Sequence, residues 1–429
     1  MAPMAQAARW PSRGQAAAAR VRQASELWWL HPSRIILLVL MPVYLSVLAY
    51  DFKTHTPIAY VPGWDYAFGL LLLLLAMLAG VQLALAHRHT VNTVPPPQIS
   101  LALMLMLLLP ALAAYAVWFG PVLLRTELLL EVARGERSEI RDDIATVKGV
   151  TTFTQFGLAY VIAYAIKSGA QPGAVTRIEK AGLALIFLLA FFRAFAWAER
   201  LAVMELLVCF TVTRMAYLPI TSNRSWRLAR VVPALAPFAL YGVFTATEYF
   251  RTWEFLTNQY SSVWELSLDR LITYYATAVN NGIGVLVETP DWPYYSGAFV
   301  FESLWLTPGL GPLLDGAFGN RRIVESHWLQ VLGNPAFNSS TAYFRTVLDL
   351  GYFGSVLYYT GLGYLIGRAY LGLQRGHVFG LLMYGVFVLH LIESLRYGYL
   401  GETRFAPLVI GLTLVALDIH RLRNKSRPS

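Results

Sequence analysis

Arginine residues in excess of nearby acids carry the clearest chemical signal in this sequence. Guanidinium groups bind phosphate oxygens in bidentate geometry, so arginines without matching acids predict an anionic, phosphate-bearing ligand. The simpler alternative is that Arg345 and Asp349, or Arg200 and Glu205, neutralise each other or extend to a membrane surface. The arginines concerned lie at the ends of apolar runs or in polar segments beside them: Arg193, Arg200, Arg270, Arg321, Arg322, Arg345, Arg396 and Arg404.

Two polar segments add further reactive or aromatic groups. Two cations, a carboxylate and an imidazole fall within seven residues, at Arg321, Arg322, Glu325 and His327. Aromatic residues that suit the faces of sugar rings are Trp292, Tyr294, Tyr295 and Trp328. Anchoring at a membrane interface explains the same aromatic residues about as well.

The sequence contains no signature of a metal or cofactor site. It lacks an Asp-x-Asp pair, a His-Glu-x-x-His motif and a glycine-rich phosphate loop. The single cysteine, Cys209, lies in an apolar run and is expected to be a buried structural residue. We therefore expect neither a metal nor a cofactor.

Composition predicts an integral membrane protein. Of 429 residues, 56% are hydrophobic and only 14% are charged, whereas soluble domains carry about 25% charged residues. About ten apolar runs approach the roughly 20 residues that a helical crossing needs. They lie near residues 35–50, 67–86, 99–119, 152–166, 181–196, 201–217, 231–244, 342–365, 378–391 and 405–417.

The charge distribution predicts the topology and argues against nucleic-acid binding. The net charge is +9, but many cations flank apolar runs as the positive-inside rule requires. With an even number of crossings, both basic termini lie in the cytoplasm. The expected organisation is a cytoplasmic segment (1–32), seven transmembrane helices (33–250), a large periplasmic loop (251–341), three further transmembrane helices (342–420) and a cytoplasmic tail (421–429).

The expected periplasmic parts contain helical patterns of their own. In residues 262–280, Trp264, Leu268, Leu271 and Tyr275 share one helical face, which predicts an amphipathic helix lying along the interface. Mixed charges at helical spacing between residues 120 and 149 predict a solvated surface helix. The predicted fold class is an all-α polytopic membrane protein with amphipathic helices in one large, late loop.

A pattern around the eighth apolar run resembles the signature of bacterial oligosaccharide repeat-unit polymerases, the O-antigen and exopolysaccharide polymerase family of the Wzy type. The order of parts is also similar: many spans, a large late loop, then a few closing spans. Arg200 at a turn, and Arg322 separated from Gly333 by ten residues, resemble further family features. The earlier loop departs from the family, because Arg125 and Gly135 enclose only nine residues. The pattern consists of Asn338, Ser339, Ser340, Thr341, Tyr343, Phe344, Arg345, Asp349, Leu350, Gly351, Tyr352, Phe353 and Gly354.

The resemblance implies a metal-independent glycosyltransferase of the GT-C-like kind in the bacterial inner membrane, with a periplasmic active face. Its substrates would be undecaprenyl-diphosphate-linked oligosaccharides: a growing chain as donor and a lipid-linked repeat unit as acceptor. Membrane lipid, a chain-length regulator and a flippase are the implied partners, and no nucleic acid is expected.

The resemblance also implies roles for individual residues. Arg200, Arg322 and Arg345 would hold the diphosphate, with Arg193 and Arg270 behind them, and fixed cations would stabilise the leaving group. His327, slightly preferred, or Glu325 would be the base, with Glu302 and Asp315 in reserve. Asp349 would orient Arg345, Glu199 would support the site, and sugars would stack on Trp292, Tyr295 and Trp328.

Two other functions stay open at this point. A ligase that moves finished polysaccharide from the same lipid onto a lipid A core would share the fold and the leaving group. A transporter or flippase would move the substrate without chemistry, and its sites are expected near the bilayer midplane.

Overall fold

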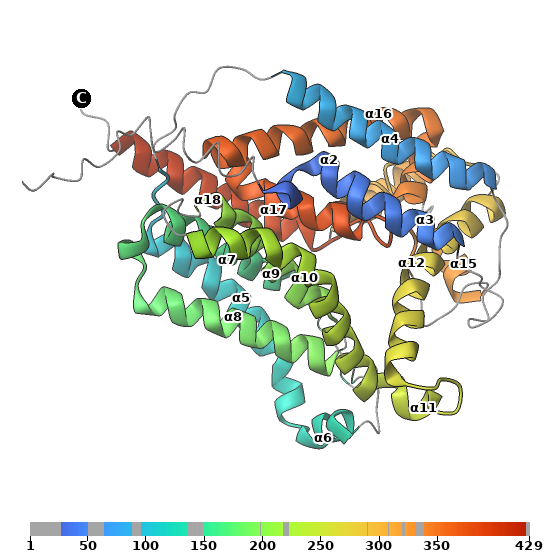
Figure 1. Cartoon of the computed structure of the whole chain (residues 1–429), viewed down its shortest axis with the longest axis horizontal. Helices are drawn as coiled ribbons and strands as arrows, with labels where there is room; N and C mark the ends of the chain where they lie inside the picture. The colour runs from blue at the N-terminus through green and yellow to red at the C-terminus, as the bar shows by residue number, and fades with distance from the viewer. Residues whose placement is uncertain are drawn as a thin grey trace, which may run out of the picture.

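The chain is a bundle of α-helices (Figure 1). The computed structural model describes residues 27–49, 64–87, 96–134, 140, 144, 147, 149–197, 199–217, 223–289, 291–307, 309–319, 322–331 and 339–425. Within these ranges there is no β-strand. The predicted all-α class is therefore confirmed for this part of the chain.

Each of the ten predicted apolar runs falls on a helix. The first run spans α2 (Pro32–Ile35), η2 (Ile36–Leu40) and α3 (Met41–Ala49). The others fall on α4 (Trp64–Ala86), α5 (Leu101–Leu123), α7 (Gln155–Ala170), α8 (Arg177–Ala196), α9 (Leu201–Met215), α10 (Asn223–Glu248), α16 (Ala342–Arg375), α17 (Val378–Glu393) and α18 (Phe405–Lys425).

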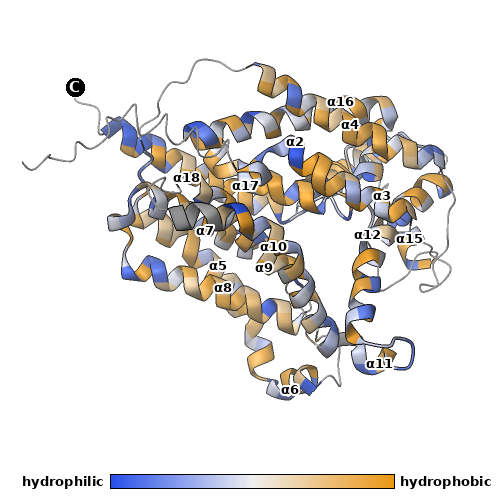
Figure 2. Ribbon diagram, in the orientation of Figure 1, coloured by the Kyte–Doolittle hydropathy of each residue, from blue (hydrophilic) through white to orange (hydrophobic). Residues whose placement is uncertain are grey.

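Four helical segments of the described chain are long and apolar enough to cross a membrane: Pro32–Ala49, α4, α5 and α18. α17 is apolar but has only 16 residues, and α7 and α9 have 16 and 15. α8 and α16 carry charged residues near their ends. Figure 2 shows hydrophobic residues along most of α3, α4 and α5, with hydrophilic residues near helix ends such as the C-terminal end of α18.

Close backbone packing joins α4 to α16 in the core. A Cβ atom placed on Gly363 would lie 2.0 Å from the Met77 carbonyl oxygen, so only glycine permits this approach. Small residues also let helix backbones approach closely within membranes, where the hydrophobic effect does not drive helices together. α17 lies against both α16 and α9, which brings the last third of the chain onto its middle.

The polar region between α10 and α16 contains short helices and one long one. The short ones are η5 (Tyr249–Trp253), α11 (Glu254–Leu256), α13 (Glu302–Trp305), α14 (Leu310–Phe318) and α15 (Arg322–Val331). The surface helix expected between residues 120 and 149 is present as α6 (Thr126–Arg134), and most of the rest of that segment lies outside the described residues.

The prediction of an interfacial helix at residues 262–280 is wrong in part. α12 (Val263–Glu288) begins with Trp264 and Leu268 half exposed, as expected. It then continues beyond the predicted end, and residues 276–286 are all buried. Small residues explain the difference, because Gly282 and Gly284 leave room for the rings of Phe344 and Trp328. The amphipathic period ends where the helix enters the protein.

Candidate functional site

Ion pairs join the ends of helices that lie far apart in the sequence. Residues 394–404, which connect α17 to α18, run past three such groups. We call them the Arg345 cluster (Arg345, Glu302, Glu325 and Glu402), the Glu248 cluster (Glu248, Arg200 and Arg270) and the Arg404 group (Arg404, Glu205, Arg193 and Glu199). The ion pairs link residues of α8, α9, α10, α12, α13, α15 and α16 with the connection between α17 and α18.

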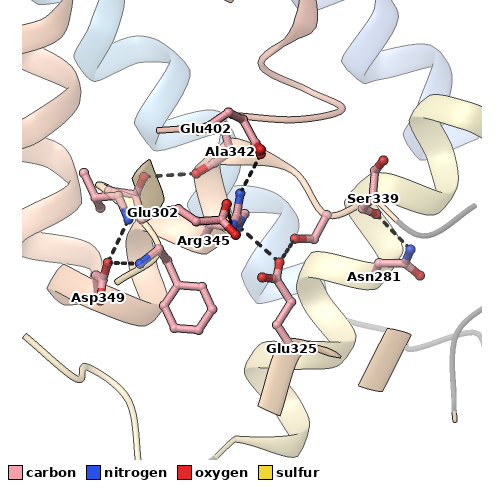
Figure 3. A network of polar contacts seen from close by, with 12 residues as sticks. Asn281, Glu302, Glu325, Ser339, Ala342, Arg345, Asp349 and Glu402 are labelled. Atoms are coloured by element: carbon pink, nitrogen blue, oxygen red, sulfur yellow. Dashed lines mark hydrogen bonds and ion pairs between the residues drawn. The ribbon is translucent and has the colours of Figure 1, made fainter. Parts of the chain in front are cut away.

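Arg345 forms the centre of the first cluster, one turn into α16 (Figure 3). Its Nη2 lies 2.8 Å from Glu302 Oε2, its Nε 3.2 Å from Glu325 Oε1, and its Nη1 3.3 Å from Glu402 Oε1. The arginine is only 8% exposed. The three carboxylates come from α13, α15 and the connection between α17 and α18, so the cluster joins three separate segments.

The residues just before α16 hold Arg345 in place. The Asn281 side chain of α12 donates to the Ser339 carbonyl oxygen at 2.9 Å, and the Thr341 amide donates to the Ala278 carbonyl oxygen at 3.0 Å. Ser340 donates its hydroxyl to Glu325 of the cluster (Figure 3). These contacts explain the local role of the Ser-Ser-Thr residues in the family-like pattern.

Glu402 is the carboxylate of this cluster with a perturbed acidity. Burial, and then the neighbouring Glu302 carboxylate, raise the pKa of Glu402 to about 7, and Arg345 and Arg404 only partly oppose this. A carboxyl group that titrates near neutral pH can take and return a proton under physiological conditions. Three carboxylates around one guanidinium thus produce a candidate acid–base group.

Asp349 anchors a loop instead of orienting Arg345, so that expectation is wrong. Its carboxylate accepts hydrogen bonds from the Ser296 hydroxyl at 2.8 Å and from the Phe299 and Val300 amides at 2.7 and 2.8 Å. The side chain is fully buried, and these donors compensate for its charge. The Asp349 contact to this loop appears at the left of Figure 3.

Gly351 breaks α16 two residues after Asp349. Its φ of 65° and ψ of 178° lie outside the range that other residues adopt readily. The break leaves the Leu348 and Asp349 carbonyl oxygens available, and they accept hydrogen bonds from the Tyr294 and Tyr295 amides at 2.9 and 2.7 Å. The Asp-x-Gly residues therefore attach the aromatic loop to the start of α16.

The Glu248 cluster brings together two arginines predicted to hold the diphosphate. Arg200 donates to Glu248 Oε1, and Arg270 Nε lies 3.2 Å from Glu248 Oε2. Glu248 is fully buried at the end of α10. The Arg200 guanidinium also lies 4.0 Å from the centre of the Phe244 ring, and its Nε has no hydrogen-bond partner among the described residues.

The Arg404 group contains Arg193, another arginine predicted to hold the diphosphate, and Glu199. Arg193 donates to Glu199, with its Nε at 2.7 Å, and lies over the Trp118 ring at 4.6 Å. Arg404 lies 3.6 Å from the buried Glu205. Glu205 also accepts from Gln155 at 3.1 Å and from the Tyr399 hydroxyl at 2.6 Å. Arg200 and Glu205 therefore have different partners from the ones expected.

The predicted excess of unpaired arginines is wrong in the described part of the chain. Arg193, Arg200, Arg270, Arg345, Arg396 and Arg404 each lie beside a glutamate. Four of these glutamates are not among the partners predicted from the sequence: Glu248, Glu302, Glu393 and Glu402. Glu393 is three residues from Arg396, but the other three lie far in sequence from their arginines, so a comparison of neighbours along the chain underestimates the available acids.

Other predicted residues are divided between the site and its surroundings. Glu325 and the reserve candidate Glu302 belong to the Arg345 cluster. His327 is exposed, and Asp315 on α14 has no described contact with Arg345. Since Glu325 and His327 are two residues apart on α15, they point to different sides of the helix. The Arg322 side chain, Arg321 and Gly333 lie outside the described residues.

The aromatic candidates also differ from one another. Trp328 is 2% exposed and packs against α12, so its ring is not available for sugar stacking. Trp292 is partly buried, and its indole N–H donates to the Leu286 carbonyl oxygen at 3.0 Å. Tyr295 is 71% exposed, and its ring is accessible to a ligand.

Glu402 and Glu248 are the functional candidates that the sequence reasoning missed. Glu248 has a usable signal, because it is a lone acid at the end of an apolar run. Glu402 stands between two apolar runs and close to Arg404, but nothing in the sequence pairs it with Arg345.

No family model matches the chain, and no curated protein or solved structure is significantly similar to it.

Proposed function

We propose that the protein is a membrane glycosyltransferase that polymerises lipid-linked oligosaccharides. It transfers a growing glycan from undecaprenyl diphosphate onto a lipid-linked repeat unit. The proposal includes about ten membrane crossings and an active face on the periplasmic side of a bacterial inner membrane. The four apolar helices and the family-like pattern around α16 support it.

The observation that carries the proposal is the Arg345 cluster with its neutral-range carboxyl group. A glycosyl transfer to a hydroxyl acceptor needs a base, and the best base has a pKa near the working pH. Glu402 meets this requirement, and Glu302 and Glu325 stand beside the same guanidinium. Glu402 therefore replaces His327 as the preferred base, and Glu325 stays in the site as its neighbour.

The Glu248 cluster supports binding of the diphosphate. Two guanidinium groups, those of Arg200 and Arg270, lie beside the one buried carboxylate of Glu248. An arginine has five N–H donors, and the Nε of Arg200 has no hydrogen-bond partner among the described residues. Fixed cations of this kind stabilise negative charge on a departing diphosphate without a metal.

The proposed reaction forms one glycosidic bond and breaks one bond between a sugar and a diphosphate. The acceptor hydroxyl oxygen forms a bond to the anomeric carbon of the donor sugar, and the bond from that carbon to the diphosphate oxygen breaks. The bonding electrons leave with the diphosphate, whose negative charge Arg200 and Arg270 compensate. The hydroxyl proton passes to Glu402, and Arg345 holds the carboxylates in position throughout.

Elongation by the purified protein tests this function. The protein in lipid nanodiscs receives native lipid-linked repeat units in the presence of EDTA, with no energy source. We expect a ladder of longer lipid-linked glycans from wild type and from the Glu288→Gln control, since Glu288 is exposed at the end of α12. We expect no ladder from Glu402→Gln.

Other outcomes separate the rival functions. No elongation by wild-type protein would refute the polymerase proposal. Transfer of intact chains to a lipid A core without elongation would favour a ligase. A change in the membrane side of the substrate without any new glycosidic bond would favour a transporter.

A further inference from the structure

Tyr274 joins a further arginine to the Glu248 cluster. It lies on α12 one turn after Arg270, so the two side chains share one face of the helix. The Arg200 guanidinium lies 6.0 Å from the centre of the Tyr274 ring, and the Arg396 guanidinium lies 5.7 Å from the same centre. Arg396 comes from the connection between α17 and α18, and the proposed reaction does not use it.

Aromatic rings position these two arginines. The Arg200 guanidinium lies 4.0 Å from the centre of the Phe244 ring, and the Phe244 and Tyr274 rings meet edge to face with their centres 5.9 Å apart. A cation–π contact acts through the charge of the guanidinium and supplies no oxygen acceptor to its N–H groups. The rings therefore hold the Arg200 and Arg396 side chains, and the N–H donors still require acceptors.

Arg396 is more accessible than the two arginines of the Glu248 cluster. Its side chain is 29% exposed, against 19% for Arg200 and 15% for Arg270. Its Nε lies 3.3 Å from Glu393 Oε2, but neither of these atoms has a hydrogen-bond partner among the described residues. Glu393 thus offsets the charge of Arg396 without holding it by a hydrogen bond at these two atoms. An exposed guanidinium of this kind can bind a phosphate oxygen.

We propose that Arg396 is a third diphosphate-binding residue, together with Arg200 and Arg270. The shared contact with Tyr274 places the Arg396 guanidinium beside that of Arg200. A diphosphate has two phosphate groups with several acceptor oxygens, so it can bind several guanidinium groups at once. This inference rests on the proposed function and deepens it, because it adds a residue of the α17–α18 connection to the site that binds the leaving group.

Affinity for a soluble prenyl diphosphate tests the assignment separately from the chemistry. Geranyl diphosphate is titrated calorimetrically into the full-length protein in detergent micelles that contain EDTA. Arg396→Gln removes the guanidinium, Arg396→Lys keeps the charge but loses the planar fork of donors, and Glu393→Gln removes the acid beside Arg396. Arg368→Gln is the matched control, since Arg368 is also half-buried but lies in the C-terminal part of α16.

We expect Arg396→Gln to bind geranyl diphosphate about 10- to 100-fold more weakly than wild type, the effect of one lost hydrogen bond to a charged group. Arg396→Lys should lose less affinity. Glu393→Gln and Arg368→Gln should bind at least as tightly as wild type. If SDS unfolding shows that Arg396→Gln does not fold, Arg396→Lys takes its place in the comparison with Glu393→Gln.

Three results would overturn the assignment. An unchanged affinity of Arg396→Gln would show that Arg396 does not touch the diphosphate. Equal weakening by Arg396→Gln and Glu393→Gln would show that the pair supports the fold and not the ligand. No binding by wild type would also remove the diphosphate site of the proposed function. Elongation of lipid-linked glycan is measured separately, so failure of the polymerase proposal is distinguishable from failure of this one.

Discussion

The titration of Glu402 gives the sharpest quantitative prediction. Its pKa is about 7 in the folded protein, against an ordinary value of 4.5. Between pH 4.5 and about pH 7, the Glu402 carboxyl group keeps its proton in the folded protein but has lost it in the unfolded chain. The stability that this proton provides is complete below pH 4.5 and is lost as the pH rises through about 7.

The size of the effect follows from the two pKa values. At 1.36 kcal/mol for each pH unit, the free energy of unfolding falls by up to about 3 kcal/mol, of which about 2–3 kcal/mol lies between pH 5 and pH 8. Glu402→Gln has no such titration. We therefore expect Glu402→Gln to gain this amount relative to wild type over that pH interval.

The assay is reversible unfolding with increasing SDS in mixed micelles, at pH 5, 6, 7 and 8. Glu288→Gln is the matched control, and its difference from wild type should not change with pH. The wild-type elongation rate should rise with pH to a plateau with a midpoint near 7, because the base must be deprotonated. A pH-independent stability difference between wild type and Glu402→Gln would refute the reasoning about this cluster.

Three further substitutions test the parts that hold the site. Gly351→Ala should lower the free energy of unfolding by about 1–3 kcal/mol because the φ angle of Gly351 is positive. Gly361→Ala is the control and should not lower it, because a Cβ at Gly361 meets nothing within 4 Å. Unfolding in SDS measures both variants. Arg345→Met leaves three carboxylates without their cation. In the same assay it should lower the free energy of unfolding by about 3–5 kcal/mol at pH 8 and by less at pH 5. Asp349→Asn replaces one carboxylate oxygen that accepts from loop amides and should cost about 1–3 kcal/mol; limited proteolysis should then cut near Phe299 faster than in wild type, and an unchanged rate would contradict the anchoring role.

The positions of the helices could be predicted from the sequence because they depend on local hydrophobicity. The runs near residues 67–86 and 99–119 correspond to α4 and α5 within a few residues. The course of α12 could not be predicted in the same way. Its first half follows the amphipathic pattern, but its second half is buried by contacts with Trp328 and Phe344, which are distant in the sequence.

The candidate site shows the same division. The family-like pattern includes Arg345, Asp349 and Gly351, which in the structure are the centre of an ion-pair cluster, the anchor of a loop and a break in α16. Their partners depend on the tertiary fold: Glu402 reaches Arg345 across 57 residues, and Glu248 reaches Arg200 across 48. Periodicity and spacing contain no information on such pairs. The charge balance of the site therefore becomes visible only once the helix ends are assembled.

Binding of a polyprenyl diphosphate by Arg200 and Arg270 is the step on which the proposed function most depends. A cryo-electron microscopy structure of the protein with undecaprenyl diphosphate in nanodiscs tests this most directly. We expect phosphate density within hydrogen-bond distance of both guanidinium groups, with the sugar-bearing end toward Glu402. Phosphate density at the basic segments of the opposite helix ends, or no phosphate density near either guanidinium group, would contradict this proposal.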